Sequence, residues 1–189
     1  MPRQELDALV RASLILAASA SALSCGPDTR EGTLRRLREE GRAGIVTVEG
    51  RERFSDGQWS KHGTFVFRDE RGEVIASGSY DDGLETGAWS ETYEDGSRGR
   101  GHYAAGSRTG EWNTFHSNGA HQDNGVYDRG LRTGLWVSRR PDETLLREAE
   151  YREGKLHGEV VFYGLDGLTW EPEGSGVYED GEKVAPLDR

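Results

Sequence analysis

Cysteine is almost absent from this sequence of 189 residues, which contains Cys25 alone. Because one cysteine cannot form an intrachain disulfide, such cross-links are excluded as the source of stability. Hydrophobic residues make up only 33% of the chain, too little for a thick two-layer core. The fold must therefore rest on something other than disulfides or a large aliphatic interior.

Clusters of basic residues are missing as well. The formal net charge is −10, and the arginines are interspersed with aspartate and glutamate. A surface of this sign repels a phosphate backbone, so nucleic acid is excluded as an expected partner. We attribute the acidity to solubility.

Glycine and aromatic residues are what the chain has in quantity. It contains 27 glycines, five tryptophans and seven tyrosines. This aromatic content argues against disorder, since disordered chains are poor in aromatic residues. Together the two residue classes favour a thin, glycine-punctuated architecture in which aromatic rings provide the packing.

The sequence repeats itself with a period of about 24 residues. One anchor is a glycine two residues before an aromatic or β-branched residue; these leading glycines are Gly63, Gly87, Gly110, Gly134 and Gly158. A second anchor is a Tyr-x-x-Gly motif, which starts at Tyr80, Tyr103, Tyr127, Tyr151 and Tyr178. Two independent anchors with one period indicate tandem repeats. A partial unit, with Phe54 and Gly57 in the second anchor, comes before residue 63.

Each unit contains two turn signals. The first lies nine residues after the leading glycine, mostly as Asp-Gly or Asn-Gly, the strongest short hairpin signals. In one unit Pro141-Asp142 replaces it, and this pair also breaks a strand. The second follows each tyrosine. Every unit is thus predicted to be one β-hairpin, and residues 44–183 are predicted to form an array of hairpins, with a tail over 184–189.

Strand alternation is irregular within the units. Trp112 and Phe115 are three residues apart, so a regular strand would place them on opposite faces. Either a bulge intervenes or aromatic residues occupy both faces of the sheet.

The first 24 residues are predicted to be a signal peptide with a helical apolar segment. Arg3 and Arg11 precede an apolar run of 12 residues from Ala12 to Leu23, which suits a signal-peptide core and is too short to span a membrane. Residues 25–43 are predicted to be a tether with a short helix, in which Thr33 caps the N-terminus and Gly41 ends it. The segment "GIVTVEG" from Gly44 is predicted to be the first strand.

The residues around the cysteine, Ala22-Leu23-Ser24-Cys25, resemble the lipobox of bacterial lipoproteins. The resemblance implies cleavage before Cys25, lipidation of Cys25 and anchoring to a membrane. Gly26, in place of aspartate, implies an outer-membrane lipoprotein that faces the periplasm or the cell surface. A non-lipidated secretory signal and a cytosolic protein with an apolar N-terminal helix stay open as alternatives.

The repeated segments "GEWNTFHSNG" and "NGVYDRGLRTG" resemble the MORN repeat in its bacterial variant form, over about Gly50 to Lys183. The resemblance implies an all-β fold, an elongated single-layer antiparallel sheet of tandem hairpins. It also implies that aromatic residues of adjacent hairpins stack as a one-dimensional core. Similar arrays occur in proteins described as antitoxins and in envelope proteins.

Five regularly spaced aromatic residues are the candidate binding face: Trp89, Trp112, Trp136, Tyr103 and Tyr127. They have two interpretations. As core, they hold neighbouring hairpins together; as an exposed row, they would meet a glycan or an extended peptide. Position in the repeat does not distinguish the two.

Two of the five histidines, His116 and His121, are candidate metal ligands. A two-residue turn at Asn118-Gly119 would place His116 opposite His121, with Asp123 on the same face, so that the imidazoles could share Zn²⁺ or Cu²⁺. Two histidines in a single unit are too few for a typical site, so we favour a solvated pair. His62 and His157 are predicted to be turn residues and His102 a strand residue, and the pair Asp81-Asp82 is assigned to a turn.

These observations predict a non-enzymatic, envelope-anchored scaffold that binds a protein or glycan partner and needs no cofactor. A cytosolic antitoxin-like protein that neutralises a partner toxin is the alternative. The third hypothesis, from another class, is a metal-assisted enzyme centred on His116 and His121.

Overall fold

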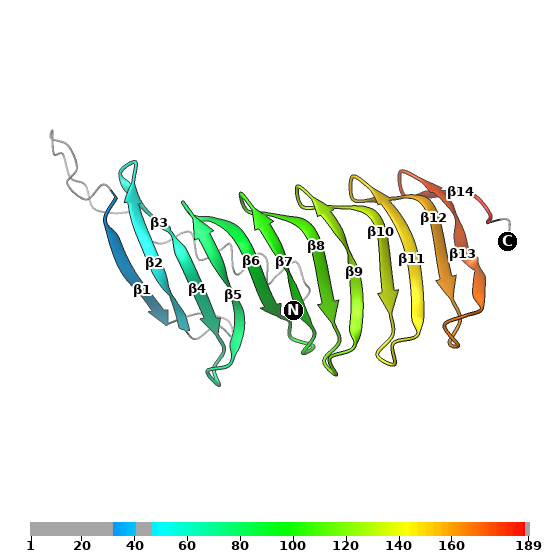
Figure 1. Ribbon diagram of the computed structural model, residues 1–189, viewed down its shortest axis with the longest axis horizontal. Helices are drawn as coiled ribbons and strands as arrows, with labels where there is room; N and C mark the ends of the chain where they lie inside the picture. Colours follow the sequence, from blue (N-terminus) through cyan, green and yellow to red (C-terminus); the bar gives the residue numbers. More distant parts are fainter. Residues whose placement is uncertain (1–31, 41–46, 188–189) are drawn as a thin grey trace.

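A computed structural model describes residues 32–40 and 47–187. Within these ranges the protein is all-β and contains no helix, and a single open sheet of 14 strands runs along the long axis of the molecule (Figure 1). The strands are β1 (Leu34–Glu40), β2 (Thr47–Ser55), β3 (Gln58–Lys61), β4 (Gly63–Arg68), β5 (Val74–Asp81), β6 (Leu84–Thr92), β7 (Arg98–Ala104), β8 (Ser107–Phe115), β9 (His121–Asp128), β10 (Leu131–Arg139), β11 (Leu145–Arg152), β12 (Lys155–Tyr163), β13 (Trp170–Glu179) and β14 (Glu182–Ala185).

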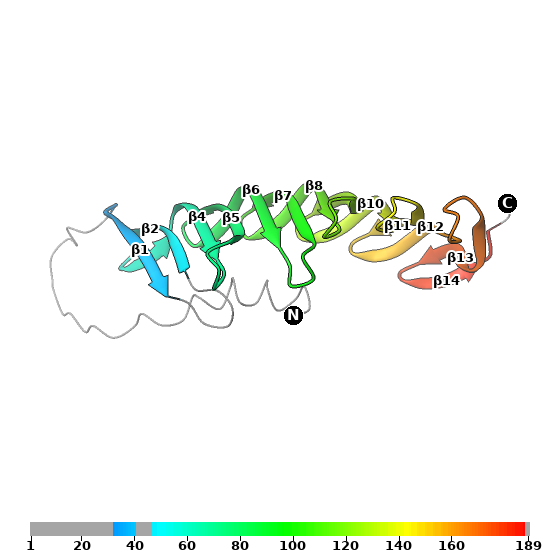
Figure 2. The same ribbon diagram turned by 90° about the horizontal axis from the view of Figure 1, so that it is seen from below.

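Neighbouring strands follow the sequence order, except that β3 and β4 both pair with β2, and every pairing is antiparallel. The predicted array of hairpins is therefore confirmed. Seen from the side, the hairpins form a thin ribbon (Figure 2).

The short helix predicted within residues 33–41 is wrong, because Leu34–Glu40 is strand β1. This strand pairs with β2 from Leu34↔Arg53 to Glu40↔Thr47. A helix of this length is far below the roughly 12–15 residues at which isolated helices become marginal, whereas the edge of β2 offers a partner along the whole segment. The sheet thus begins before residue 44, and β14 extends it into the predicted tail. The predicted signal peptide and Cys25 lie outside the described residues.

The turn after each Tyr-x-x-Gly tyrosine is a tight two-residue turn. Asp81 pairs with Leu84, and the two residues between them, Asp82 and Gly83, have φ angles of 46° and 83°. Two consecutive positive φ angles define the type I′ turn that matches strand twist. The same φ pattern recurs at Asp56-Gly57, Ala105-Gly106, Arg129-Gly130, Glu153-Gly154 and Asp180-Gly181.

The Asp-Gly and Asn-Gly turns are one residue longer than predicted, and they lie on the opposite long edge of the sheet (Figure 1). The His116 amide donates to the Ala120 carbonyl at 2.8 Å, and the Gly119 amide donates back to the His116 carbonyl at 2.8 Å. This is a three-residue hairpin loop with Gly119 in the left-handed region, at φ 91°. The turn at Tyr93–Gly96 has the same two hydrogen bonds.

Each leading glycine bends its strand. Next to Gly110, Arg100 pairs with Asn113 but His102 pairs with Thr109, so β8 contains two residues more than β7 over this interval. Gly110 has φ 64°, which a residue with a side chain rarely adopts. The bulge recurs at the leading glycines of β6, β10 and β12. In the first unit the strand is broken there, between β3 and β4.

Hydrogen bonds tie each unit to the next along both rows of turns. On one edge, the amide of a type I′ glycine donates to a carbonyl of the preceding unit, as from Gly83 to Lys61 and from Gly106 to Glu85. On the other edge, the imidazole of His116 contacts the Arg139 carbonyl at 2.9 Å, and Arg140 donates to the Tyr163 carbonyl at 2.6 Å. These bonds fix the spacing between neighbouring hairpins.

The core is a single file of aromatic rings, here called the aromatic ladder. Successive rings meet edge to face, the geometry that the ring quadrupole favours. The centroid distances are Phe65–Tyr80 5.0 Å, Tyr80–Trp89 5.2 Å, Trp89–Tyr103 5.6 Å, Tyr103–Trp112 5.5 Å, Trp112–Tyr127 6.2 Å, Tyr127–Trp136 5.0 Å and Trp136–Tyr151 6.4 Å.

Each indole of the ladder lies against a glycine of the preceding strand. A Cβ added at Gly101 would come within 2.0 Å of Trp112, and one added at Gly125 within 2.2 Å of Trp136. Where the same position is occupied by Ala149, the residue at the tryptophan position is the smaller Val160. A glycine at the first position thus makes room for a tryptophan at the second, whereas an alanine leaves room only for a smaller side chain.

Candidate functional site

The five aromatic residues of the predicted binding face belong to the aromatic ladder. Trp89, Trp112 and Trp136 are only 3%, 1% and 1% exposed, Tyr103 is also buried, and Tyr127 is half-buried. The sequence left core and exposed row open as alternatives, and the structure places the three indoles in the core. Because covered rings cannot touch a partner, any binding surface must be sought elsewhere.

Cationic side chains cover the ladder on its open side. Arg108 lies 4.4 Å above the Trp112 ring, Arg132 lies 4.1 Å above the Trp136 ring, and the Lys61 ammonium lies 4.9 Å from the Tyr80 ring. All three cations occupy the position two residues before a leading glycine, next to the bulge or, for Lys61, next to the break between β3 and β4. Such cation–π contacts stabilise by about 0.5–2 kcal/mol each.

Arg132 shows the electrostatic effect of this position. Burial lowers the pKa of its guanidinium, but interactions with the phenols of Tyr127 and Tyr151 outweigh burial and raise the pKa above its ordinary value. Arg132 therefore stays charged over the ladder at every physiological pH.

A buried ionic cluster joins the three adjacent strands β6, β7 and β8. The Glu91 carboxylate accepts hydrogen bonds at 2.9 Å from each of three groups: the phenols of Tyr93 and Tyr103 and the guanidinium of Arg108. The side chains of Glu91 and Arg108 are 7% and 15% exposed. Tyr103 belongs to the aromatic ladder and Arg108 lies over the Trp112 ring, so the cluster ties these strands to the core.

Removing the cation of this cluster is expected to destabilise the array. Arg108→Ala would leave the Glu91 carboxylate buried without its counter-charge, which costs about 3–5 kcal/mol of unfolding free energy. Chemical denaturation monitored by tryptophan fluorescence measures the loss. Arg129→Ala is the matched control, since the Arg129 side chain is 89% exposed and forms an ion pair with its chain neighbour Asp128. Equal stability of the two variants would contradict a structural role for the cluster.

His116 and His121 do not form the predicted pair. Because the loop contains three residues instead of two, His121 pairs with Phe115, and the rings of these two residues lie 4.7 Å apart. His116 instead contacts the backbone of the next unit, and Asp123 accepts a hydrogen bond from Ser138 at 2.6 Å. A shift of one residue moves a side chain to the other face of the sheet, so the expected pairing of the two histidines is wrong, and the arrangement considered for a shared metal ion is not formed.

Aromatic residues occupy both faces of the sheet, which answers the question raised by Trp112 and Phe115. Trp112 lies in the ladder, whereas Phe115 lies under the guanidinium of Arg100 at 4.6 Å. Arg100 comes from β7, where Gly101 and Tyr103 point to the ladder face. The second face is therefore polar and charged with isolated aromatic contacts.

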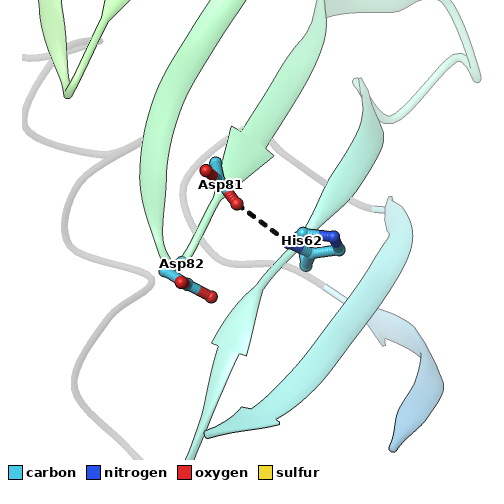
Figure 3. Close-up of side chains that lie close together, drawn as sticks. All are labelled: His62, Asp81 and Asp82. Atoms are coloured by element: carbon cyan, nitrogen blue, oxygen red, sulfur yellow. Dashed lines mark ion pairs between the residues drawn. The ribbon is translucent and has the colours of Figure 1, made fainter. Parts of the chain in front are cut away.

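A cluster that the sequence analysis missed lies at the end of the sheet that contains the first unit (Figure 3). His62 Nδ1 lies 3.3 Å from Asp81 Oδ1, and Asp82 completes a group whose metal-binding atoms all lie within 4.8 Å of one another. His62 lies in the break between β3 and β4, as expected for a connecting residue. The turn assignment of His157 is wrong, because His157 lies inside β12, whereas the strand assignment of His102 is confirmed.

The signal for this cluster was present in the repeat itself. The leading glycine Gly63 pairs with Tyr80, so the residue before the glycine lies beside the residue after the tyrosine. Applying the register across units would have placed His62 beside Asp81. Comparison of residues within a single unit does not reveal this proximity.

One repeat position is exposed in every unit. The residue directly after the leading glycine points away from the ladder, since strand side chains alternate. We call these residues the display row: Thr64, Ala88, Glu111, Leu135 and Glu159. Their chemistry changes from unit to unit, whereas the buried position next to them is aromatic in four units and valine in the fifth.

The turn between β12 and β13 contains an aspartate with a low pKa. Hydrogen bonds from the Thr169 hydroxyl and from the amides of Leu168 and Thr169 lower the pKa of Asp166 to about 2. Because the pKa of Asp166 is depressed in the folded protein, its ionised carboxylate stabilises the fold at pH values above the ordinary pKa of 3.8. This contribution is lost as the pH falls through about 2.

Thr169→Ala is expected to raise the pKa of Asp166 toward 3.8, because the largest cause of the depression is removed. Carboxyl chemical shifts followed by NMR between pH 1.5 and about 6 give the pKa directly. Asp142, whose pKa is lowered by the equivalent Thr144, serves as internal control and should titrate unchanged. An Asp166 pKa that does not move would show that the backbone amides alone set it.

Comparison with known proteins gives no further assignment. No model of a known protein family matches the chain, and a search of curated proteins also gives no match. In residues 32–40 and 47–187 we find no helix that is long and apolar enough to cross a membrane.

Proposed function

We propose that this protein is a non-enzymatic, envelope-anchored repeat scaffold that binds a protein or glycan partner through the display-row face of its sheet. The observation that carries the proposal is the contrast between the two faces. The ladder face is filled by the protein's own side chains, whereas the display row is exposed and changes between polar, apolar and acidic residues from one unit to the next. A scaffold needs this division, in which one face maintains the array and the other is free to vary.

The resemblance to MORN repeats agrees with a scaffold role. The five units are tied by the aromatic ladder and by hydrogen bonds along both edges, which makes a long, stiff surface. The exposed side chains include Glu111 and Glu159 as well as Leu135. A mixed polar and apolar surface of this kind suits a folded protein or a glycan better than a polyanion.

The proposed anchoring of the protein to a membrane rests on the sequence. It is supported by the apolar run from Ala12 to Leu23 and by Cys25 directly after a small residue. Incorporation of radiolabelled palmitate, compared between the native protein and Cys25→Ala, tests it. Label that depends on Cys25 and sediments with membranes is the expected result. Unlabelled full-length protein in the cytosolic fraction would contradict anchoring and favour the antitoxin-like alternative.

Binding is tested separately by site-specific photo-crosslinking in cells. A photoreactive residue at Ala88, Glu111 or Leu135 is expected to give the same discrete adduct, because the three positions lie in one row. Arg129, which is exposed on a turn, is the control position and should give none. Absence of an adduct along the row, or equal labelling at Arg129, would contradict binding through this face.

A further inference from the structure

We propose that His62, Asp81 and Asp82 form a site for one divalent transition-metal ion, and that Zn²⁺ fits its donors best. One nitrogen of the imidazole and one oxygen of each carboxylate lie within 4.8 Å of one another (Figure 3). Imidazole and carboxylate are ordinary zinc ligands, and three protein ligands leave the fourth tetrahedral position to water. The site lies outside the display row and is independent of the proposed function.

The backbone brings the three ligands together. His62 lies where the strand is broken between β3 and β4, and the pairing of Gly63 with Tyr80 places it beside Asp81 at the end of β5. Asp82 is the first residue of the type I′ turn, held at φ 46°. The ligands therefore come from two adjacent units.

The imidazole of His62 has an unsatisfied nitrogen. Its Nδ1 atom is buried and has no hydrogen-bond partner, although Asp81 Oδ1 lies 3.3 Å away. Buried polar atoms are rarely left unpaired, and those that are call for an explanation such as a bound ion. A metal ion placed between Nδ1 and the two carboxylates would give this nitrogen a partner. It would also lie between Nδ1 and the Asp81 carboxylate and bind both.

His157 shows that the repeat position alone does not make the site. It lies directly before Gly158 as His62 lies before Gly63, and its Nδ1 is also buried without a hydrogen-bond partner. In the described ranges, however, the only group of three potential ligands with this spacing is the one at His62. Gly158 pairs with Tyr178, and the acids Glu179 and Asp180 follow this tyrosine as Asp81 and Asp82 follow Tyr80. His157 is therefore a matched control that shares the backbone position, but its ring and these two acids do not form such a group.

The charges around the site favour a cation. Apart from the imidazole, two carboxylates face one cation, Arg53, whose Nη2 donates to both oxygens of Asp82 at 2.5 Å. Each carboxylate oxygen can accept more than one interaction, so Arg53 would orient Asp82 in the way that outer-shell partners orient metal ligands. The adjacent Lys61 directs its ammonium to the rings of the ladder. The local charge is thus −1 without the ion.

Titration calorimetry with ZnCl₂, and the visible absorption of Co²⁺ as its substitute, test the proposal. The full chain is used with Cys25→Ala in every arm, because a free thiol also binds zinc. His62→Ala and Asp81→Asn are expected to weaken binding about tenfold or more, since even outer-shell changes alter metal affinity by 10–100-fold. His157→Ala should bind one ion with unchanged affinity.

Three results would overturn the site: no binding heat and no Co²⁺ spectrum with the parent chain, undiminished binding by His62→Ala and Asp81→Asn, or equal weakening by His157→Ala. Asp81→Asn preserves the shape of the side chain on an exposed strand end, so it decides the outcome if His62→Ala does not fold. Circular dichroism of each variant verifies that the sheet is intact.

Discussion

Replacing Gly101 by alanine is expected to reduce the free energy of unfolding by about 3 kcal/mol or more. The added Cβ would lie 2.0 Å from Cε3 of Trp112 and 2.6 Å from its Cδ2, far inside van der Waals contact. Trp112 cannot move away, because Tyr103 and Tyr127 pack on either side and Arg108 covers it. Overpacking of this kind usually costs about 1–3 kcal/mol, and the rigid surroundings place this case at or above the upper end. Equilibrium denaturation followed by tryptophan fluorescence measures the change.

The strand pair β11 and β12 supplies a control for this interpretation, since Ala149 and Val160 already stand where three earlier strand pairs have glycine and tryptophan. Between β9 and β10, Gly125→Ala alone is expected to be as damaging as Gly101→Ala. The double variant Gly125→Ala/Trp136→Val recreates the natural pair of Ala149 and Val160. It should therefore lose less stability than the sum of its two single variants. Simple additivity would show that the clash is not the cause.

Trp112→Ala is expected to cost about 3–5 kcal/mol and to divide the array in two. Trp112 is 1% exposed and links Tyr103 of one unit to Tyr127 of the next. In a repeat protein each unit contacts only its neighbours, so loss of a central contact weakens the coupling between the two sides. Differential scanning calorimetry should resolve one transition in the native protein and two in the variant.

Trp170→Ala is the matched control for this experiment. Trp170 begins β13 at the far end of the sheet and is half-buried outside the aromatic ladder. Its removal should lower stability less and leave a single transition. A single transition for Trp112→Ala as well would mean that the backbone hydrogen bonds along the two edges, rather than the ladder, make the array cooperative.

The candidate sites show where inference from sequence failed. The pairing of His116 with His121 assumed a two-residue loop, and a loop of three residues placed them apart. The cluster at His62 was overlooked because its ligands belong to different units, and their distance depends on the register between units. A predicted register that is wrong by one residue is enough to bring two candidate ligands together or to place them apart.

The sequence by itself determined the period, the hairpin nature of each unit and the position of both kinds of turn. These follow from local chemistry, because glycine tolerates positive φ and because the anchors recur at fixed spacing. The tertiary structure alone decided three things. It made Leu34–Glu40 a strand by offering it the edge of β2. It buried the tryptophans, because bulges at the leading glycines fold each strand over the ladder. It also joined His62 to Asp81, because contacts between hairpins depend on register, which no single unit encodes.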